Sequence, residues 1–151
     1  MANEDNTKDN VEGNKAVVRR YYEAVLNGGD VDALAGLAVA EYVEHDPLPG
    51  QTTGRDGLRQ RVEMLRQAFR AHFTIEDLIA EQDKVVARWT SRGTHVGEFL
   101  GMPPTGKAYT IAGIDIHRLR DGEMAEHWHV VDQLSQMQQL GLIPQPSGAG
   151  A

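Results

Sequence analysis

The spacing of apolar residues changes from a helical period to a strand period near residue 70. Before this point, apolar residues recur three and four positions apart, which predicts amphipathic helices over 14–26, 31–38 and 58–69. After it, apolar and polar residues alternate, which predicts strands over 73–79, 84–95, 107–119 and 123–131. Helices followed by a run of strands predict an α+β domain.

The strands follow one another directly along the chain, so an antiparallel meander is the simplest topology. We expect the N-terminal helices to pack in a strongly curved, mostly antiparallel sheet, giving a cone-shaped α+β barrel. Such a cone has one open mouth and naturally encloses a ligand pocket. Asp132 can cap a short last helix that ends before Gly141.

A chain of 151 residues is long enough for one domain with a substantial core. Residues 1–13 and 144–151 have too few apolar side chains to order themselves. We therefore predict a disordered N-terminal tail over 1–13, a folded domain over 14–143, whose first helix Asn14 caps, and a flexible C-terminal tail over 144–151.

Composition excludes several functional classes. The net charge of −7 and the lack of a basic cluster argue against nucleic-acid binding. No cysteine is present, which excludes disulfides and Cys-ligated metal sites. No apolar run reaches the ~20 residues of a membrane span, and the polar N-terminus does not resemble a secretory signal. We expect a cytoplasmic protein without a membrane partner.

The predicted hairpin over 113–132 concentrates ionisable side chains: Asp115, His117, Glu126, His127, His129 and Asp132. A two-residue Asp121-Gly122 loop would put Asp115 opposite Trp128, with His129 on the other face. A three-residue loop that includes Arg120 would put Asp115 opposite His127 and bring His129 onto the same face, diagonally adjacent. A carboxylate beside an imidazole can act in acid/base chemistry near neutral pH.

Asp115 and His129 are therefore the predicted catalytic pair. Two histidines of the hairpin with Asp115 could also form a facial metal triad. An H-x-H spacing is weak on its own, and we predict no metal and no cofactor. The remaining predicted pocket residues, which would bind substrate, are His45, Tyr42, His117, His127, Trp89, Arg88 and Met102. The structural alternatives are an exposed ion pair for Arg88, with Glu76 or Glu126, and a surface position for His45.

Three segments, HVGEFLGMPPTG (95–106), DGEMAEHW (121–128) and QLG (139–141), resemble the SnoaL-like polyketide cyclase family in order and spacing. This family belongs to the nuclear-transport-factor-like and ketosteroid-isomerase-like cones, and the resemblance covers about residues 14–143. It implies closure of the last ring of an anthracycline-type polyketide by intramolecular aldol condensation, without cofactor or metal. The substrate would be an apolar, aromatic or polycyclic ketone.

The family uses a His and an Asp on the last two strands as its acid/base pair. The resemblance transfers these roles to Asp115 and His129, with the two residue types exchanged, and favours the three-residue loop. It also leaves two alternatives open: a cofactor-independent hydroxylase of aromatic polyketide biosynthesis, and a non-catalytic small-molecule-binding module. It implies a homodimer or a homotetramer.

Overall fold

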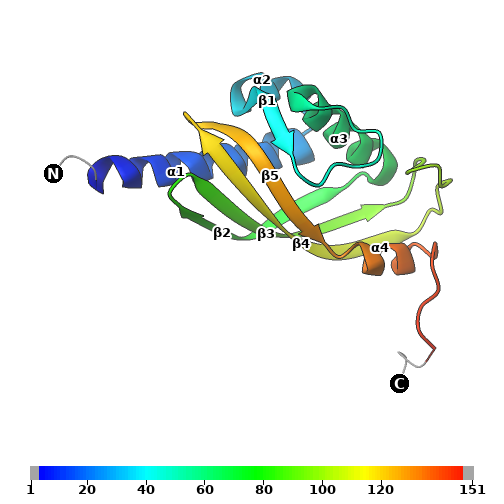
Figure 1. The fold of residues 1–151 in the computed structure, drawn as a ribbon. Coiled ribbons are helices and arrows are strands. Elements are labelled where there is room, and N and C mark those ends of the chain that lie inside the picture. The colour runs from blue at the N-terminus through cyan, green and yellow to red at the C-terminus, as the bar shows by residue number, and fades with distance from the viewer. Residues whose placement is uncertain (1–3, 148–151) are drawn as a thin grey trace.

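The computed structural model describes residues 4–147 and confirms the α+β fold, with a curved five-stranded sheet in the order β1-β5-β4-β3-β2 (Figure 1). The helical elements are α1 (Glu4–Arg20), its π-helical continuation η1 (Tyr21–Asn27), the 3-10 turn η2 (Val31–Ala33), α2 (Leu34–Leu37), α3 (Gly54–Phe69) and α4 (Gln133–Gln139). The strands are β1 (Ala38–Glu44), β2 (His72–Glu81), β3 (Lys84–Thr94), β4 (Ala108–Arg120) and β5 (Glu123–Val131).

The four strands β2 to β5 pair antiparallel, as their consecutive order predicts. The fifth strand, β1, pairs parallel with β5 at the edge of the sheet. This strand was not among the four predicted strands, because parallel pairing depends on contacts far away in the chain. In the range 4–147, no helix is long and apolar enough to cross a membrane.

The first helix begins earlier than the sequence predicted. Asn14 lies inside α1 and does not cap it, and residues 4–13, predicted to be disordered, form the first turns of this helix. Each residue added to an existing helix gains one hydrogen bond without the cost of nucleation. The helix can therefore extend from the buried part of α1 toward the N-terminus. Residues 1–3 and 148–151 of the predicted tails lie outside the described residues, and residues 144–147 have no helix or strand.

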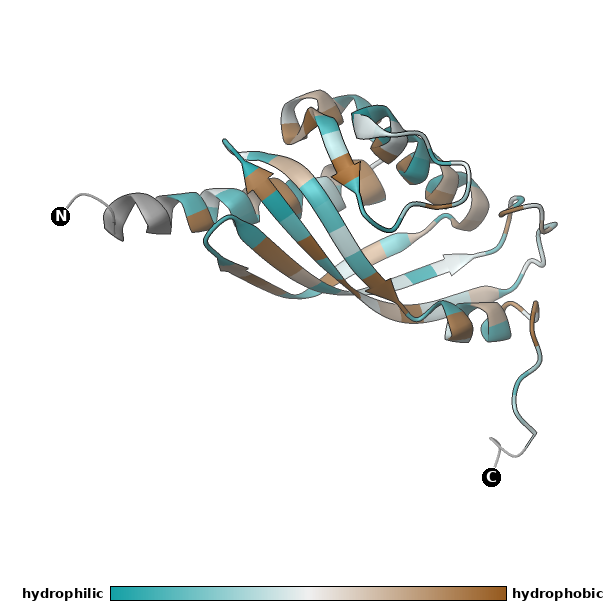
Figure 2. Ribbon diagram, in the orientation of Figure 1, coloured by the Kyte–Doolittle hydropathy of each residue, from teal (hydrophilic) through white to brown (hydrophobic). Residues whose placement is uncertain are grey.

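The alternation along the strands sets the two faces of the sheet (Figure 2). On β3, Val85, Ala87 and Trp89 are buried on one face, as the alternation predicts, and Arg88 lies on the other, exposed face. The predicted cap at Asp132 is also present, because its carboxylate accepts a hydrogen bond of 3.2 Å from the backbone N–H of Ser135. The inward face of the sheet and the helices together form one core.

The β4–β5 hairpin differs from both predicted registers. Its loop has two residues, Asp121 and Gly122, each with positive φ (51° and 79°), so the predicted three-residue loop is wrong. Asp-Gly suits such a turn, whose twist matches that of the flanking strands. The register then shifts at Ala125, which is left without a partner on β4. The extra residue reverses the face that each later side chain of β5 takes. Asp115 and His129 therefore share a face despite the short loop.

Gly113 gives a test of this packing. It lies opposite Trp89, and a Cβ added there would lie 2.2 Å from Cζ2 of the buried indole. We expect Gly113→Ala to lower the free energy of unfolding by about 1–3 kcal/mol, because the ring must move. Gly36→Ala is the matched control, since its Cβ would meet nothing within 4 Å. Equal denaturation midpoints for the wild type and Gly113→Ala would contradict this packing.

Candidate active site

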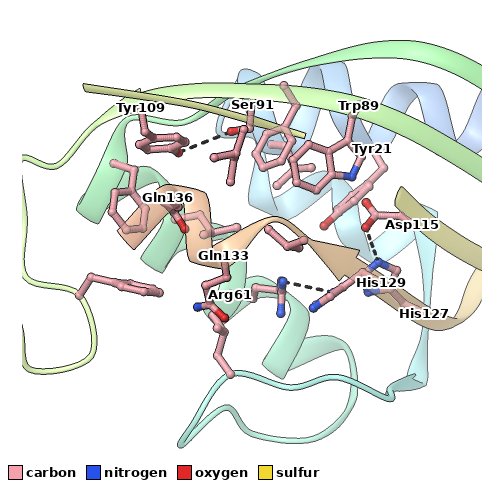
Figure 3. A pocket seen from close by; sticks show the side chains of 18 residues that line it. Tyr21, Arg61, Trp89, Ser91, Tyr109, Asp115, His127, His129, Gln133 and Gln136 are labelled. Atoms are coloured by element: carbon pink, nitrogen blue, oxygen red, sulfur yellow. Dashed lines mark hydrogen bonds and ion pairs between the residues drawn. The ribbon is translucent and has the colours of Figure 1, made fainter. Parts of the chain in front are cut away.

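A pocket opens between the helices and the concave face of the sheet (Figure 3). Its walls are mainly aromatic and aliphatic, and its ionisable side chains gather at one end. The lining residues are Tyr21, Leu26, Leu48, Arg61, Leu65, Phe69, Phe73, Trp89, Ser91, Phe99, Tyr109, Ile111, Asp115, His127, His129, Val131, Gln133 and Gln136. An apolar pocket with a few convergent polar groups is typical of a small-molecule site.

Asp115 lies at the charged end of the pocket and is 7% exposed. Tyr22 donates its hydroxyl proton to one carboxylate oxygen, and Nε2 of His127 lies 3.2 Å from the other. Burial alone would raise the pKa of Asp115, but His127, His117 and Tyr22 outweigh it and hold this pKa below its ordinary value. The carboxylate is therefore ionised and already occupied by two partners.

His127 lies between two carboxylates. Its Nδ1 is 2.6 Å from Oε2 of Glu44 on the neighbouring strand β1, and its Nε2 faces Asp115. Burial disfavours the charged imidazole, but Asp115 and Glu44 outweigh this effect and raise the pKa of His127 to about 9. His127 is therefore an imidazolium at neutral pH.

His117 lies behind this pair rather than in the pocket, which corrects its predicted contact with substrate. Its Nε2 is 3.2 Å from the hydroxyl of Tyr22. Since the single hydroxyl proton goes to Asp115, Nε2 of His117 must be the donor in this contact. Burial and the adjacent His127 lower the pKa of His117 to about 3, so it is neutral. His117, Tyr22 and Asp115 thus form a hydrogen-bonded chain that orients the carboxylate.

His129 faces the pocket on the side of helix α3. Its Nδ1 is 3.4 Å from Nη2 of Arg61 and 3.9 Å from Oε1 of Glu44, and its backbone N–H donates to Asp46. Arginine can only donate, so Nδ1 of His129 carries its lone pair toward Arg61. Burial, Arg61 and His127 all lower the pKa of His129. A neutral imidazole therefore faces the pocket at pH 7.

The predicted catalytic residues, Asp115 and His129, are backbone partners in the sheet, but their side chains do not contact each other. Asp115 lies directly opposite His129, where the favoured three-residue loop would have placed them diagonally. The carboxylate instead contacts His127, one pleat along β5. Both predicted catalytic residues line the same pocket, with His127 between them in the network of contacts.

Of the other predicted substrate-binding residues, Trp89 and His127 line the pocket. Tyr42 is buried in the core, and Met102 pairs with Phe99 in the turn of the 96–106 loop, but neither lines the pocket. Phe99 takes the position at the wall that the sequence suggested for Met102.

Two predicted residues lie on the outside of the protein. Arg88 forms an exposed ion pair of 2.6 Å with Asp77, because alternation along β3 points it away from the concave face. His45 stacks on Trp128 with 4.5 Å between ring centroids and lies 3.4 Å from Glu126. Their predicted places in the pocket are therefore wrong.

Among residues 4–147, two groups of three side chains have potential metal-ligand atoms within 4.8 Å of one another: Glu44, His127 and His129, and Asp115, His117 and His127. Both groups need His127, whose two nitrogens face carboxylates and whose imidazole is protonated. The first group also has the Arg61 cation beside its ligating nitrogen. This donor set fits a hydrogen-bonded cluster better than a divalent-metal site.

Three side chains at this site were not selected from the sequence: Tyr21, Glu44 and Arg61. Tyr21 belongs to the apolar stripe of the first helix, and nothing local distinguishes a tyrosine that lines a pocket from one that packs in the core. Glu44 comes close to His127 only through the parallel pairing of β1 with β5. Arg61 belongs to a helix with several arginines, and nothing in the sequence distinguishes it from the others.

Comparison with known proteins identifies relatives over most of the chain. A sequence model of the SnoaL-like polyketide cyclase family matches residues 16–140. The aklanonic acid methyl ester cyclase DauD of Streptomyces sp. (strain C5) is 32% identical over 141 residues, which cover 89% of this chain and 84% of DauD.

Two solved structures extend the likeness to the fold. TsrD from Streptomyces laurentii superposes with a TM-score of 0.80 at 31% identity, over 87% of this chain and 97% of TsrD. AclR from Streptomyces galilaeus, a candidate hydroxylase, superposes with a TM-score of 0.77 at 25% identity, over 91% of this chain and 87% of AclR.

The charge of His127 should make stability depend on pH. Its pKa is raised from 6.5 to about 9, so its ion pairs contribute fully below pH 6.5 and are lost as the pH rises through 9. The groups around it are Asp115, Glu44, His117 and His129. We expect the melting temperature of the wild type to fall between pH 7 and 9.5.

The matched variants are His127→Gln, which should lose this decline above pH 7, and His45→Gln, which should keep it because His45 lies outside the cluster. A decline of the same size in His127→Gln would show that another group causes it. Differential scanning calorimetry over this pH range measures all three proteins.

Proposed function

This chain belongs to the SnoaL-like polyketide cyclase family, and from this premise we propose that it closes a ring of a polycyclic β-keto ester by intramolecular aldol addition. The observation that carries the proposal is a neutral imidazole, His129, in an aromatic-walled pocket beside a cation. The relative DauD is an aklanonic acid methyl ester cyclase, which supports a methyl ester of this type as substrate.

His129 is the proposed base. The carboxylate of Asp115 is a weaker base, since Tyr22 and His127 stabilise its ionised form. The imidazole of His129 is neutral and its lone pair is directed into the pocket end where Arg61 lies. A carbon between two carbonyl groups is acidic enough for such a base, and general acid/base catalysis contributes about 10²–10⁴-fold.

His129 alone can carry the proton through the whole reaction. His129 takes a proton from the carbon between the ketone and the ester, and the electron pair left behind forms an enolate. The enolate carbon forms a bond with a second ketone carbon of the same molecule, and the π electrons of that carbonyl move to its oxygen. The His129 imidazolium then returns its proton to this oxygen, giving an alcohol and the starting enzyme.

Asp115 has a positioning role in this mechanism. It keeps His127 charged and is itself oriented by Tyr22 and His117. The resulting imidazolium lies at the pocket wall next to His129, with 5.1 Å between ring centroids. Its positive charge favours the anionic enolate over the neutral substrate.

The far end of the pocket suits a flat, oxygenated ring system. Aromatic side chains form its walls, and Trp89 and Phe73 meet edge to face with 5.0 Å between centroids. Ser91, Tyr109 and Gln136 offer polar atoms there. We propose that these residues contact the ring oxygens of an aromatic polyketide.

A hydroxylase is the second candidate, because the fold is also similar to that of AclR. The same base would form a substrate carbanion that reacts with O₂, with one oxygen atom entering the product as a hydroxyl group and an added two-electron reductant, with two protons, converting the other to water. Ring closure consumes no oxygen, so an oxygen electrode separates the two reactions on the same anthraquinone keto ester.

We also propose that the protein works as a cytoplasmic homodimer or homotetramer. Ile114 and Val130 pair on the outer face of the sheet and are 45% and 77% exposed. A second copy of the chain covering this apolar pair would bury it.

Substitution of the base tests the proposal. We expect His129→Asn to lower kcat for a methyl ester of the aklanonic acid type by about 10²–10⁴-fold, because proton transfer is lost. His45→Asn should retain kcat, since its ring stacks on Trp128 outside the pocket. Product formation is followed by chromatography, and circular dichroism checks the fold. A wild-type kcat in His129→Asn would exclude His129 as the base.

The pH profile gives a second test. The pKa of His129 lies below 6.5, so kcat/KM should rise with pH below this value as the base loses its proton. It should stay level above pH 6.5 and fall near pH 9, where His127 loses its charge. Steady-state rates from pH 5 to 10 measure both limbs. A rate that keeps rising from pH 7 to 9 would instead require a base with a higher pKa.

A further inference from the structure

Helix α3 carries four arginines, and three of them are bonded to oxygen acceptors. Arg55 donates to the backbone carbonyls of residues 35 and 38, Arg59 donates to two carboxylates, and Arg66 donates to the backbone carbonyls of residues 26 and 27. These contacts fix the helix against its neighbours. None of these three side chains lines the pocket.

Arg61 is different. It lines the pocket, and its Nη1 is buried without a hydrogen-bond partner among residues 4–147. Its Nη2 has only the 3.4 Å contact with Nδ1 of His129, which is long for a hydrogen bond. A buried guanidinium donor without an acceptor is costly. An oxygen-bearing ligand in the pocket would remove this cost.

We propose that Arg61 is a further catalytic residue, which binds the two oxygens of a 1,3-dicarbonyl enolate while His129 holds the proton. This inference rests on the proposed function of the pocket. The guanidinium is a planar fork of N–H donors, and the enolate is a planar anion with an oxygen on either side of the deprotonated carbon. The proton leaves from the carbon between these oxygens, and Nη2 already lies beside the nitrogen that would receive it.

The charge of the His129 and Arg61 pair changes during the proposed proton transfer. Before proton transfer, His129 is neutral beside the Arg61 cation. After transfer, two cations lie side by side, and an enolate that contacts both of them offsets their repulsion. The Glu44 and Asp115 carboxylates nearby are paired with His127. A cation that meets its anion only after proton transfer stabilises the transition state more than the substrate.

A ligand that is already an enolate allows anion binding by Arg61 to be measured without turnover. 2-Acetylindane-1,3-dione is a flat 1,3-dicarbonyl that is an enolate anion at pH 7.5, and 2-acetylindane is a neutral ketone with the same carbon skeleton. We expect the wild type to bind the enolate more tightly in isothermal titration calorimetry. Arg61→Gln should weaken enolate binding by roughly 10- to 100-fold, as expected for charged hydrogen bonds, and change binding of the neutral ketone less than about 3-fold.

Arg59→Gln is the matched control, because Arg59 lies on the same helix but pairs with surface carboxylates. It should leave the affinity for both ligands unchanged. An equal loss for both ligands in Arg61→Gln would mean that Arg61 only maintains the pocket. No enolate binding by the wild type, or no loss in Arg61→Gln, would also overturn the inference.

The role of Arg61 and the proposed cyclase activity can be rejected independently of each other. Enolate binding that depends on Arg61, in a protein that cyclises no keto ester, would reject the cyclase proposal and keep the anion site. Conversely, if ring closure depends on His129 and Arg61→Gln retains the wild-type kcat, the cyclase proposal stands and the role of Arg61 is rejected.

Discussion

The ion pairs of His127 with Glu44 and Asp115 are the interaction on which the site depends. They join three strands, because these residues lie on β5, β1 and β4. The backbones of Glu44 and His127 are also partners in the parallel ladder. Buried charges are tolerated only when paired, and removal of one partner costs about 3–5 kcal/mol. The edge strand and the pocket wall are therefore held in place by the same contacts.

Much of the fold could be predicted from local patterns. Alternation of apolar residues placed all four antiparallel strands and the inward position of Trp89, because strand geometry fixes which face each side chain takes. The cap at Asp132 was equally local. The start of α1 was not predicted, since a polar composition does not show that a neighbouring buried helix can extend through the segment.

The site could be predicted less well, because its contacts depend on register and on distant segments. Asp115 and His129 were placed on one face for the wrong reason: a shift at Ala125, not a longer loop, brings them together. His117 has the correct parity but does not line the pocket, and its Nε2 contacts the hydroxyl of Tyr22 instead. Arg61 could not be chosen among the arginines of its helix, since only the fold shows which guanidinium lacks an acceptor.

The two histidines at the pocket wall, His127 and His129, have different charges at neutral pH. His127 has two carboxylates and stays charged, so it supplies a fixed positive charge. His129 has a guanidinium and an imidazolium as neighbours and stays neutral, which makes it a weak base. A weak base suffices only if the carbon acid is activated, as in a β-keto ester, and if the anion is stabilised as it forms. In the proposed mechanism, the cations that lower the pKa of His129 provide that stabilisation, so the same charges would select the substrate class and assist the reaction.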